Sequence, residues 1–428
     1  MSTFTGGGAQ AAPEAAAPGM ARLIAVVFMP FAGGYFLSYL FRSINAVIAP
    51  QLTSGLGLTA ADLGLLTSGY FLAFAGFQLP LGLLLDRFGP RRVQSALLLS
   101  AALGSVLFAL GDSLVELAVA RALIGLGVAG GLMSSFKAIT LWFPKERWPL
   151  INGCFLAMGG LGAIAATAPL EEALEVMDWR TVFLVLAGVT VAVSLAIHLA
   201  VPERAAHGVD RGTLREQIAG FRVVFADRLF WRVAPLTVST MAANMAIQGL
   251  WAGPWLSDVA GLDRHGVAAY LFAIAAAMTA GFVATGALAD LCGRRGIGLV
   301  PVIGTSCALF LLAQAAVTFE LAPASLLPWL AFGLLANGGT LVYPLLNRHF
   351  PISLAGRAST ALNMLAFFGA FSGQYLLGAA IDLWPPAETG GYLPEAYRWS
   401  FGAMLALQAA SLAWYFVPGG TREPETAR

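Results

Sequence analysis

Charged side chains are scarce in this sequence, and that scarcity limits what the protein can be. Of its 428 residues only 11% are Asp, Glu, Lys or Arg, whereas 58% are hydrophobic and the mean hydropathy is +0.77. Soluble domains carry about 25% charged residues. The composition therefore excludes an ordinary soluble globular protein.

Histidine and cysteine are scarcer still. The four histidines lie scattered near the ends of apolar stretches, and the three cysteines are far apart at Cys154, Cys292 and Cys307. Neither set has the spacing of a metal site, a nucleophile motif or a disulfide framework. We therefore expect no enzyme activity, no metal and no cofactor. The net charge of +1 is spread over short loops, which predicts no nucleic-acid partner.

Long apolar runs are what the sequence has in abundance. A helix of about 20 apolar residues crosses the roughly 30 Å hydrocarbon core of a bilayer, and the alternating strands of a membrane barrel are absent. We therefore expect an all-α integral membrane protein. The twelve predicted spans lie near 22–46, 61–84, 93–110, 114–141, 149–170, 180–201, 231–256, 265–288, 297–319, 326–349, 357–380 and 398–417.

The basic residues predict how these spans are oriented. With a cytoplasmic N-terminus, eighteen Lys and Arg residues fall on the cytoplasmic side and three, Arg180, Arg264 and Arg398, on the other. Lys and Arg are enriched in cytoplasmic loops. We expect both termini to be cytoplasmic, in a bacterial cytoplasmic (inner) membrane. The predicted domains are a disordered tail (1–20), a six-helix bundle (21–201), a polar linker (202–230), a second six-helix bundle (231–418) and a tail (419–428).

Part of the chain repeats at a spacing of 204 residues. Gly57-Leu58-Thr59 corresponds to Gly261-Leu262-Asp263, and a loop motif after the second span recurs after the eighth. Such internal symmetry is typical of transporters built from two membrane halves. The residues of the two loop motifs are Gly82, Asp86, Arg87, Gly89, Arg91 and Arg92 in the first copy and Gly286, Asp290, Gly293, Arg294 and Arg295 in the second.

On these motifs the chain resembles the major facilitator superfamily of secondary transporters over essentially its whole length. The run Arg121-x-x-x-Gly125-x-Gly127 in the fourth span adds to the resemblance. The first span, with Tyr39-x-x-Arg42-x-x-Asn45, is similar to the organic-anion and sugar-phosphate branches, although Phe41 stands where those branches often have aspartate. The Gly-Pro-x-x-Gly-Gly signature of drug/proton antiporters is missing from the fifth span. The resemblance implies two pseudo-symmetric six-helix bundles, alternating access, and a cavity lined by the first, fourth, seventh and tenth spans.

Helical periodicity selects the residues expected at that cavity. Successive residues of a helix are rotated by about 100°, so positions that share a face can be identified. The first, seventh, tenth and eleventh spans each carry a polar or aromatic face. For single amides and tyrosines, structural bonds between helices remain the alternative. The predicted substrate-binding residues are Tyr35, Tyr39, Arg42, Asn45, Asn244, Gln248, Trp251, Trp255, Asn337, Asn347 and Asn363.

Three cations inside predicted spans carry the most information, because charge in a bilayer is expensive. Arg42 shares a face with two tyrosines and either awaits an anion or sits at the outer end of 22–46 among lipid headgroups. Arg121 either pairs with Glu116 or takes part in ion coupling. Lys137 either faces the cavity or extends along the helix to the cytoplasmic surface. Helical periodicity does not distinguish between the two alternatives for any of these three residues.

The acidic residues of the two loop motifs are expected to act in gating. Asp86 and Asp290 end the second and eighth spans beside arginines, where a carboxylate can pair with a cation or cap a neighbouring helix. We expect Gly82, Asp86, Arg87, Gly89 and Arg91, with Asp290, Arg294 and Arg295, to form latches that differ between conformations.

Three functions fit these observations. The first is transport of a small organic anion, such as a carboxylate or phosphate compound, with coupling to a proton or sodium ion. The second is efflux of amphipathic or xenobiotic compounds by antiport, and the third is a transporter-like sensor. The missing antiporter signature favours the first. We expect a monomer whose partners are its substrate, a coupling ion and the lipid bilayer.

Overall fold

The computed structural model describes residues 19–144, 147–203, 214–387 and 390–417, and every element in these ranges is a helix. This confirms the all-α fold. The elements before the linker are α1 (Met20–Leu23), η1 (Ile24–Phe28), α2 (Met29–Ser43), α3 (Asn45–Leu56), α4 (Ala60–Leu110), α5 (Leu114–Val128), α6 (Gly131–Trp142), α7 (Trp148–Ala165), α8 (Ala168–Val176) and α9 (Trp179–Ala200).

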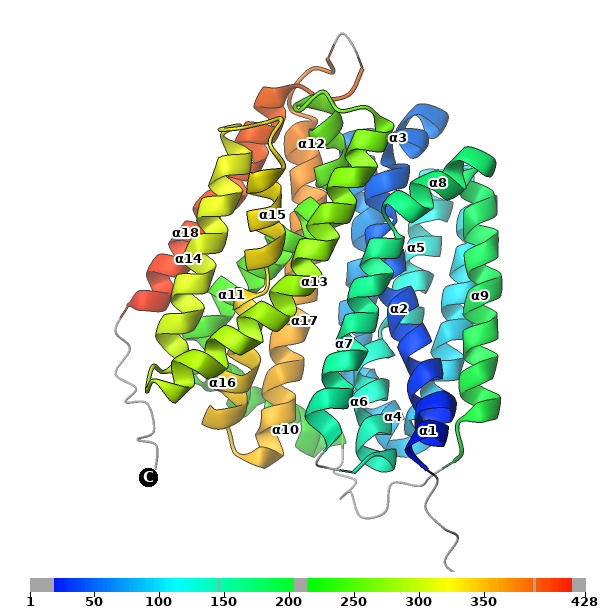
Figure 1. The fold of residues 1–428 in the computed structure, drawn as a ribbon, viewed down its shortest axis with the longest axis vertical. Helices are drawn as coiled ribbons and strands as arrows, with labels where there is room; N and C mark the ends of the chain where they lie inside the picture. The colour runs from blue at the N-terminus through cyan, green and yellow to red at the C-terminus, as the bar shows by residue number, and fades with distance from the viewer. Residues whose placement is uncertain (1–18, 145–146, 204–213, 388–389, 418–428) are drawn as a thin grey trace, which may run out of the picture.

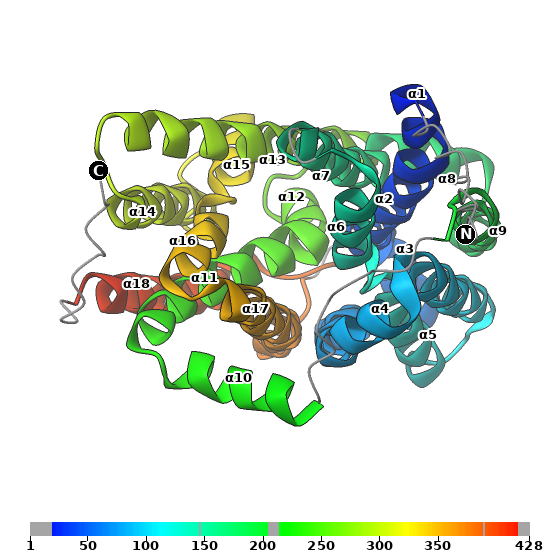
Figure 2. The ribbon, with the colours of Figure 1, turned by 90° about the horizontal axis from the view of Figure 1, so that it is seen from below.

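The second half begins with a helix inside the predicted linker. This helix, α10 (Leu214–Ala226), packs beside α17 and α11 (Figure 2). It is followed by α11 (Arg228–Ala246), η3 (Ile247–Trp251), α12 (Ala252–Asp258), α13 (Arg264–Arg294), α14 (Leu299–Thr318), α15 (Leu326–Leu335), η4 (Gly338–Leu341), α16 (Val342–His349), α17 (Ile352–Ile381) and α18 (Pro394–Phe416). Residues 204–213 of the predicted linker lie outside the described residues, as do the predicted tails except residues 19 and 20.

The helices form two groups that stand side by side. Figure 2 shows α1 to α9 in one half of the molecule and α11 to α18 in the other. In Figure 1 the upper end carries α3, α8 and α12, and the lower end carries α1, α10 and α16. We call these the far end and the linker end, and the two groups the N-terminal and C-terminal bundles.

Most of the twelve predicted spans are long, apolar helices. Within the described ranges nine helices are long and apolar enough to cross a membrane, and ten if α7 and α8, bent by 43°, count as one broken span. Gly89 divides α4 into two of them, because its φ of 76° is a left-handed conformation that favours glycine. The spans predicted near 231–256 and 398–417 are helical but less apolar.

The helical segment of the first span is longer than predicted. Helix continues past residue 46 through Pro50 and ends at Leu56, where Gly57 adopts a left-handed φ of 64° and caps the helix. The predicted span 22–46 agrees with the candidate membrane span Met20–Ser43, and the helical segment extends about three turns beyond it. As a consequence Arg42 lies near the middle of the segment and not at its outer end.

The predicted repeat is visible in local geometry. Gly57 and Gly261, 204 positions apart, both adopt left-handed φ angles, 64° and 67°. Thr59 and Asp263, which also correspond, each cap the next helix with the side chain, Thr59 on α4 and Asp263 on α13. The same short sequence pattern therefore builds the same turn at the far end of both bundles.

The glycines of the fourth-span motif allow close packing. A Cβ at Gly125 would lie 2.1 Å from the backbone oxygen of Tyr70, and one at Gly127 would lie 2.3 Å from the backbone nitrogen of Ala101. Both neighbours belong to α4, so the motif brings α5 into backbone contact with both halves of α4. Small residues serve this purpose in membrane helices.

Candidate functional site

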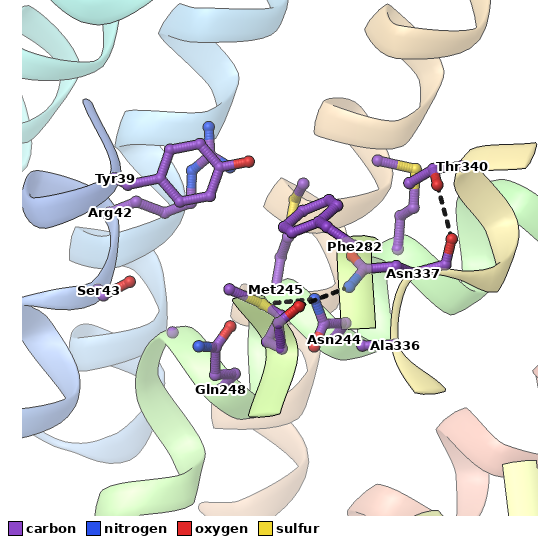
Figure 3. Close-up of a pocket in the computed structure, with 13 residues that line it drawn as sticks. Tyr39, Arg42, Ser43, Asn244, Met245, Gln248, Phe282, Ala336, Asn337 and Thr340 are labelled. Atoms are coloured by element: carbon purple, nitrogen blue, oxygen red, sulfur yellow. Dashed lines mark hydrogen bonds between the residues drawn. The ribbon is translucent and has the colours of Figure 1, made fainter. Parts of the chain in front are cut away.

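A small cavity lies between the two bundles near mid-height. Its volume is about 90 Å³. The N-terminal bundle contributes residues of α2, and the C-terminal bundle contributes residues of α11, η3, α13 and the broken helix around η4, as Figure 3 shows. The lining residues are Tyr39, Arg42, Ser43, Met241, Asn244, Met245, Gln248, Gly249, Met278, Phe282, Ala336, Asn337 and Thr340.

Arg42 supplies the charge of the cavity. Its guanidinium carbon lies 4.5 Å from the centre of the Tyr39 ring and 5.2 Å from that of Phe367 in the other bundle. Its Nε is buried and has no hydrogen-bond partner among the described residues. None of the lining residues is acidic. Arg42 is therefore a cation held between aromatic rings, with its Nε donor left to bind another group. The alternative that it meets lipid headgroups is wrong.

The C-terminal bundle presents amide groups to the cavity. Figure 3 shows Asn244, Gln248 and Asn337 across from Tyr39 and Arg42. The Asn337 amide donates to the Met278 carbonyl oxygen at 3.0 Å, and Asn244 Oδ1 is buried without a hydrogen-bond partner in the described part of the chain. The cavity therefore has a cationic wall and a neutral hydrogen-bonding wall.

Five of the predicted binding residues, Tyr39, Arg42, Asn244, Gln248 and Asn337, thus meet at one cavity. The walls that sequence reasoning missed are mostly apolar, such as Met241, Met245, Met278 and Phe282. Apolar residues are ordinary inside a membrane bundle, so no signal in the sequence separated these from the rest.

Trp251 and Trp255 do not join this site, which corrects the predicted stripe on the seventh span. They were placed on the face of Asn244 and Gln248 by assuming about 100° per residue. The segment Ile247–Trp251 is a π-helix, whose wider turn shifts the positions that follow. Both tryptophans are buried in the core instead, Trp255 against Trp329 with ring centres 5.2 Å apart.

Four further predicted residues make structural contacts elsewhere. Asn45 is fully buried and donates to Thr67 Oγ1 at 2.8 Å. Tyr35 stacks on Phe155 and donates from its hydroxyl to that of Tyr39, at 3.4 Å, from outside the cavity lining. Asn363 accepts a hydrogen bond from the Tyr343 hydroxyl. Asn347 accepts one from Ser359. It lies after η4, which interrupts the regular helix of the tenth span, so the face predicted for Asn337 does not continue to Asn347. These residues fit the alternative of bonds between packed segments.

Arg121 does not pair with Glu116. It is fully buried in α5 and donates from Nη1 to the Phe41 carbonyl oxygen at 2.9 Å, with its guanidinium 5.3 Å from the centre of the Tyr70 ring. Glu116 instead accepts from the backbone N–H groups of Asp112 and Ser113 and caps its own helix. The predicted ion pair was therefore wrong. Arg121 ties α5 to α2 directly behind Arg42.

Lys137 lies outside the lining of the cavity. Its Nζ donates to the Leu85 carbonyl oxygen at 2.9 Å, near the end of the first half of α4. The second span and the fourth are thereby joined at the linker end, next to the loop motif.

The gating motif is only partly visible. The side chain of Asp86 lies outside the described residues, and Arg87 contacts the ring of Phe88. Arg92, next to Arg91, pairs with Glu203 at 2.5 Å. In the second copy Asp290 pairs with Arg294 on the same helix at 2.8 Å. Gly82, Gly286 and Gly293 face open space, and Arg295 is the C-terminal cap of α13. In this conformation the ion pair of Asp290 lies within its own helix and does not join two helices.

Polar contacts between the bundles occur at the far end, and the sequence did not predict them. Asp382, at the end of α17, accepts from the backbone N–H groups of Ala60 and Ala61 at 3.0 and 2.7 Å. These are the first two residues of α4, so a carboxylate of one bundle caps a helix of the other. Nearby, Glu171 of α8 forms an ion pair with Arg264 of α13.

Other parts of the chain offer less to a polar solute. A larger hollow of about 540 Å³ on α11, α17 and α18 is lined by small and apolar side chains with four serines and no charge. Groups of three or more His, Cys, Asp or Glu that could hold a metal are not found among the described residues. The cavity at Arg42 combines a cation with converging hydrogen-bonding groups near the middle of the helices and has no acidic residue in its lining.

Two helical bundles around a central polar cavity define the class of membrane protein to which the chain belongs. The model of the Major Facilitator Superfamily matches residues 31–374. The chain belongs to this family, as its loop motifs suggested.

Named relatives match part of the chain. A probable sulfoacetate transporter of Cupriavidus necator is 29% identical over 161 residues, which are 38% of this chain and 37% of that protein. A probable L-galactonate transporter of Escherichia coli is 30% identical over 148 residues, 35% of this chain and 33% of the relative. The chain thus spans only about a third of the length of either relative.

Solved structures resemble the chain over almost its whole length. A bacterial homologue of the human lysosomal transporter Spinster, inward-facing and unoccupied, superposes with a TM-score of 0.74 at 19% identity, covering 91% of this chain and 95% of that one. A D-xylose-proton symporter gives a TM-score of 0.69 at 17% identity, covering 92% and 98%. These similarities establish the fold.

Proposed function

We propose that the protein is a secondary transporter that moves a small organic anion across the membrane by alternating access, and not an enzyme. The observation that carries the proposal is Arg42. It lies at mid-height between the bundles, has a donor without a partner among the described residues, and faces a cavity whose lining includes no acidic residue. A guanidinium is charged at any physiological pH and binds carboxylates with two parallel hydrogen bonds.

The facing amides support a substrate with further polar groups. Asn244, Gln248 and Asn337 can donate to and accept from hydroxyl or sulfonate oxygens, whereas a purely apolar drug would leave them unpaired. Relatives named as transporters of sulfoacetate and galactonate are consistent with such a substrate, because both compounds combine an acid group with further oxygen atoms.

The contacts at the far end support a structure closed on that side. We propose that the linker end is cytoplasmic, as the distribution of basic residues predicts, and that the membrane is the bacterial cytoplasmic membrane. Asp382 and the pair of Glu171 with Arg264 would then hold the outer side closed. Asp86 and Asp290 remain proposed latches for the opposite conformation. We propose that the transporter works as a monomer.

Uptake by purified protein in liposomes tests this function. We expect accumulation of at least one of radiolabelled sulfoacetate, L-galactonate and D-galactonate above protein-free liposomes, with inhibition by other small organic acids. Uptake should saturate, because a single cavity has to empty before the next cycle. Transport of organic cations or uncharged amphipathic drugs, with none of the acids, would overturn the proposal.

A further inference from the structure

Glu171 stands apart from the other carboxylates in the described part of the chain. It is 3% exposed, and among the described Asp and Glu residues it alone is classed as buried. The chain bends by 43° between α7 and α8, with Pro169 in the first turn of α8, and this bend turns the first turn of α8 towards α13.

The partner of Glu171 belongs to the other bundle. Arg264, the first residue of α13, forms the ion pair, and the next residue, His265, lies 3.3 Å from Glu175 of α8. Arg264 is half exposed, whereas Glu171 is enclosed. Separation of α8 from α13 would leave the Glu171 carboxylate without its cation, and a buried unpaired charge is strongly unfavourable.

A third cavity adjoins this pair. It has a volume of about 260 Å³ and is lined by residues of α3, α8, α12 and α13, including Gln51, Glu171 and Arg264. The Oε1 atom of Gln51 is buried and has no hydrogen-bond partner within the described ranges. The pair therefore borders a space at the far end that is lined by residues of both bundles.

We propose that Glu171 is the proton-binding residue of the transport cycle and that its protonation releases Arg264, which then receives the anion entering from the far end. This inference rests on the proposed function and adds the coupling ion. Proton and anion would enter together, because the neutral carboxylic acid no longer competes for the guanidinium. The bound anion then neutralises Arg264, so the far end can close over the protonated Glu171. The proton leaves when the linker end opens and the anion departs, and the restored ion pair then holds the far end of the empty protein closed.

The other groups near the transport path do not suit this role. Arg42 and Arg121 stay protonated at any physiological pH, and the lining of the central cavity contains no carboxylate. Around Glu171 the charged or titratable groups are Arg264, His265 and Glu175. On α8 Glu172 is exposed, and on α12 Asp258 accepts from the Tyr392 N–H and the Tyr397 hydroxyl.

A labelling experiment without substrate tests the conformational half of the proposal. Ala268 lines the far-end cavity and is buried, so Ala268→Cys in a background without the three native cysteines reports opening. Rates of reaction with a maleimide in detergent would be divided by those of Ser54→Cys, to cancel the pH dependence of thiol reactivity. Ser54 lines the same cavity but is already exposed in this structure, so opening should change its rate little. We expect the ratio to rise at least about fivefold as the pH falls, a change equivalent to about 1 kcal/mol.

Glu171→Gln should keep this ratio high at every pH, since a neutral amide cannot hold Arg264. Glu172→Gln, the exposed neighbour on the same helix, is the matched control and should behave like wild type. His265→Gln separates the second pair, and it should leave the pH dependence in place. A ratio that does not change with pH in the wild type, or the same response in Glu171→Gln and wild type, would overturn the assignment.

Transport tests the coupling half. In liposomes, Glu171→Gln should lose uptake of the transported acid driven by a pH gradient by at least about tenfold while it keeps exchange of labelled for unlabelled acid at equal pH. Proton-driven uptake equal to that of Glu172→Gln would contradict the proposal. A wild-type protein that transports none of the acids, yet shows the pH-dependent labelling, would instead refute the proposed substrate and leave the role of Glu171 standing.

Discussion

Replacement of Arg42 by alanine or glutamine is expected to abolish binding of the anion. Truncating one partner of a buried, hydrogen-bonded charge pair costs about 2 to 5 kcal/mol, which weakens binding about thirtyfold or more. The loss should be nearly complete here because the other polar residues lining the cavity, such as Asn244 and Gln248, are neutral. Calorimetric titration of the purified variants with the transported acid measures the effect.

Arg42→Lys provides the control for charge. Lysine keeps the positive charge but cannot form the two parallel hydrogen bonds of a guanidinium. We expect it to retain part of the affinity, between wild type and Arg42→Ala. Robust transport of a neutral or cationic compound by Arg42→Ala would show that the cavity does not depend on anion binding and would favour efflux.

Removal of the Asp382 carboxylate is expected to loosen the far end. Asp382→Ala leaves the N–H groups of Ala60 and Ala61 without their acceptor from the other bundle. Loss of a helix cap costs about 0.5 to 2 kcal/mol, and each 1 kcal/mol shifts the balance between closed and open states about fivefold. The labelling ratio of Ala268→Cys to Ser54→Cys should rise accordingly, at any pH.

Asp178→Ala is the matched control for this experiment. Asp178 caps α9 by accepting from the Thr181 N–H at 2.8 Å, but both residues belong to the N-terminal bundle. Its removal should destabilise the protein by a similar amount without opening the far end. If Asp178→Ala raised the labelling ratio as much as Asp382→Ala, the contact of Asp382 would be only one of many supports of the fold.

The sequence predicted the features that depend on composition and local pattern. Apolar runs predicted the membrane helices, and the 204-residue repeat predicted the equivalent turns at Gly57 and Gly261. Arg42 was found because an arginine amid apolar residues is conspicuous. These predictions needed no knowledge of how distant helices meet.

The sequence predicted less well wherever a helix departs from regular geometry. The π-helix at Ile247–Trp251 moved Trp251 and Trp255 away from the cavity, and the 3-10 turn at Gly338–Leu341 separated Asn347 from Asn337. No residue pattern in the sequence predicted either irregularity, because both depend on packing against neighbouring helices.

Contacts between distant residues were also beyond prediction. Asp382 and Ala60 are 322 positions apart, and Glu171 meets Arg264 across the two bundles. Periodicity assigns a residue to a face of its own helix but does not identify the residue that it meets. The sequence therefore did not show that Asp382 and Glu171 contact residues of the other bundle.

The most direct test of the central claim is a comparison of matched ligands that differ in charge. Thermal unfolding of the purified protein would be measured with a panel of small carboxylates and sulfonates, galactonate and sulfoacetate included, and with the uncharged amide of each acid. A ligand at 100 times its Kd stabilises by about 2.7 kcal/mol. The account predicts that acids raise the Tm of the wild type, that their amides do not, and that Arg42→Ala removes the difference. Equal stabilisation by acids and amides, or stabilisation that persists in Arg42→Ala, would contradict it.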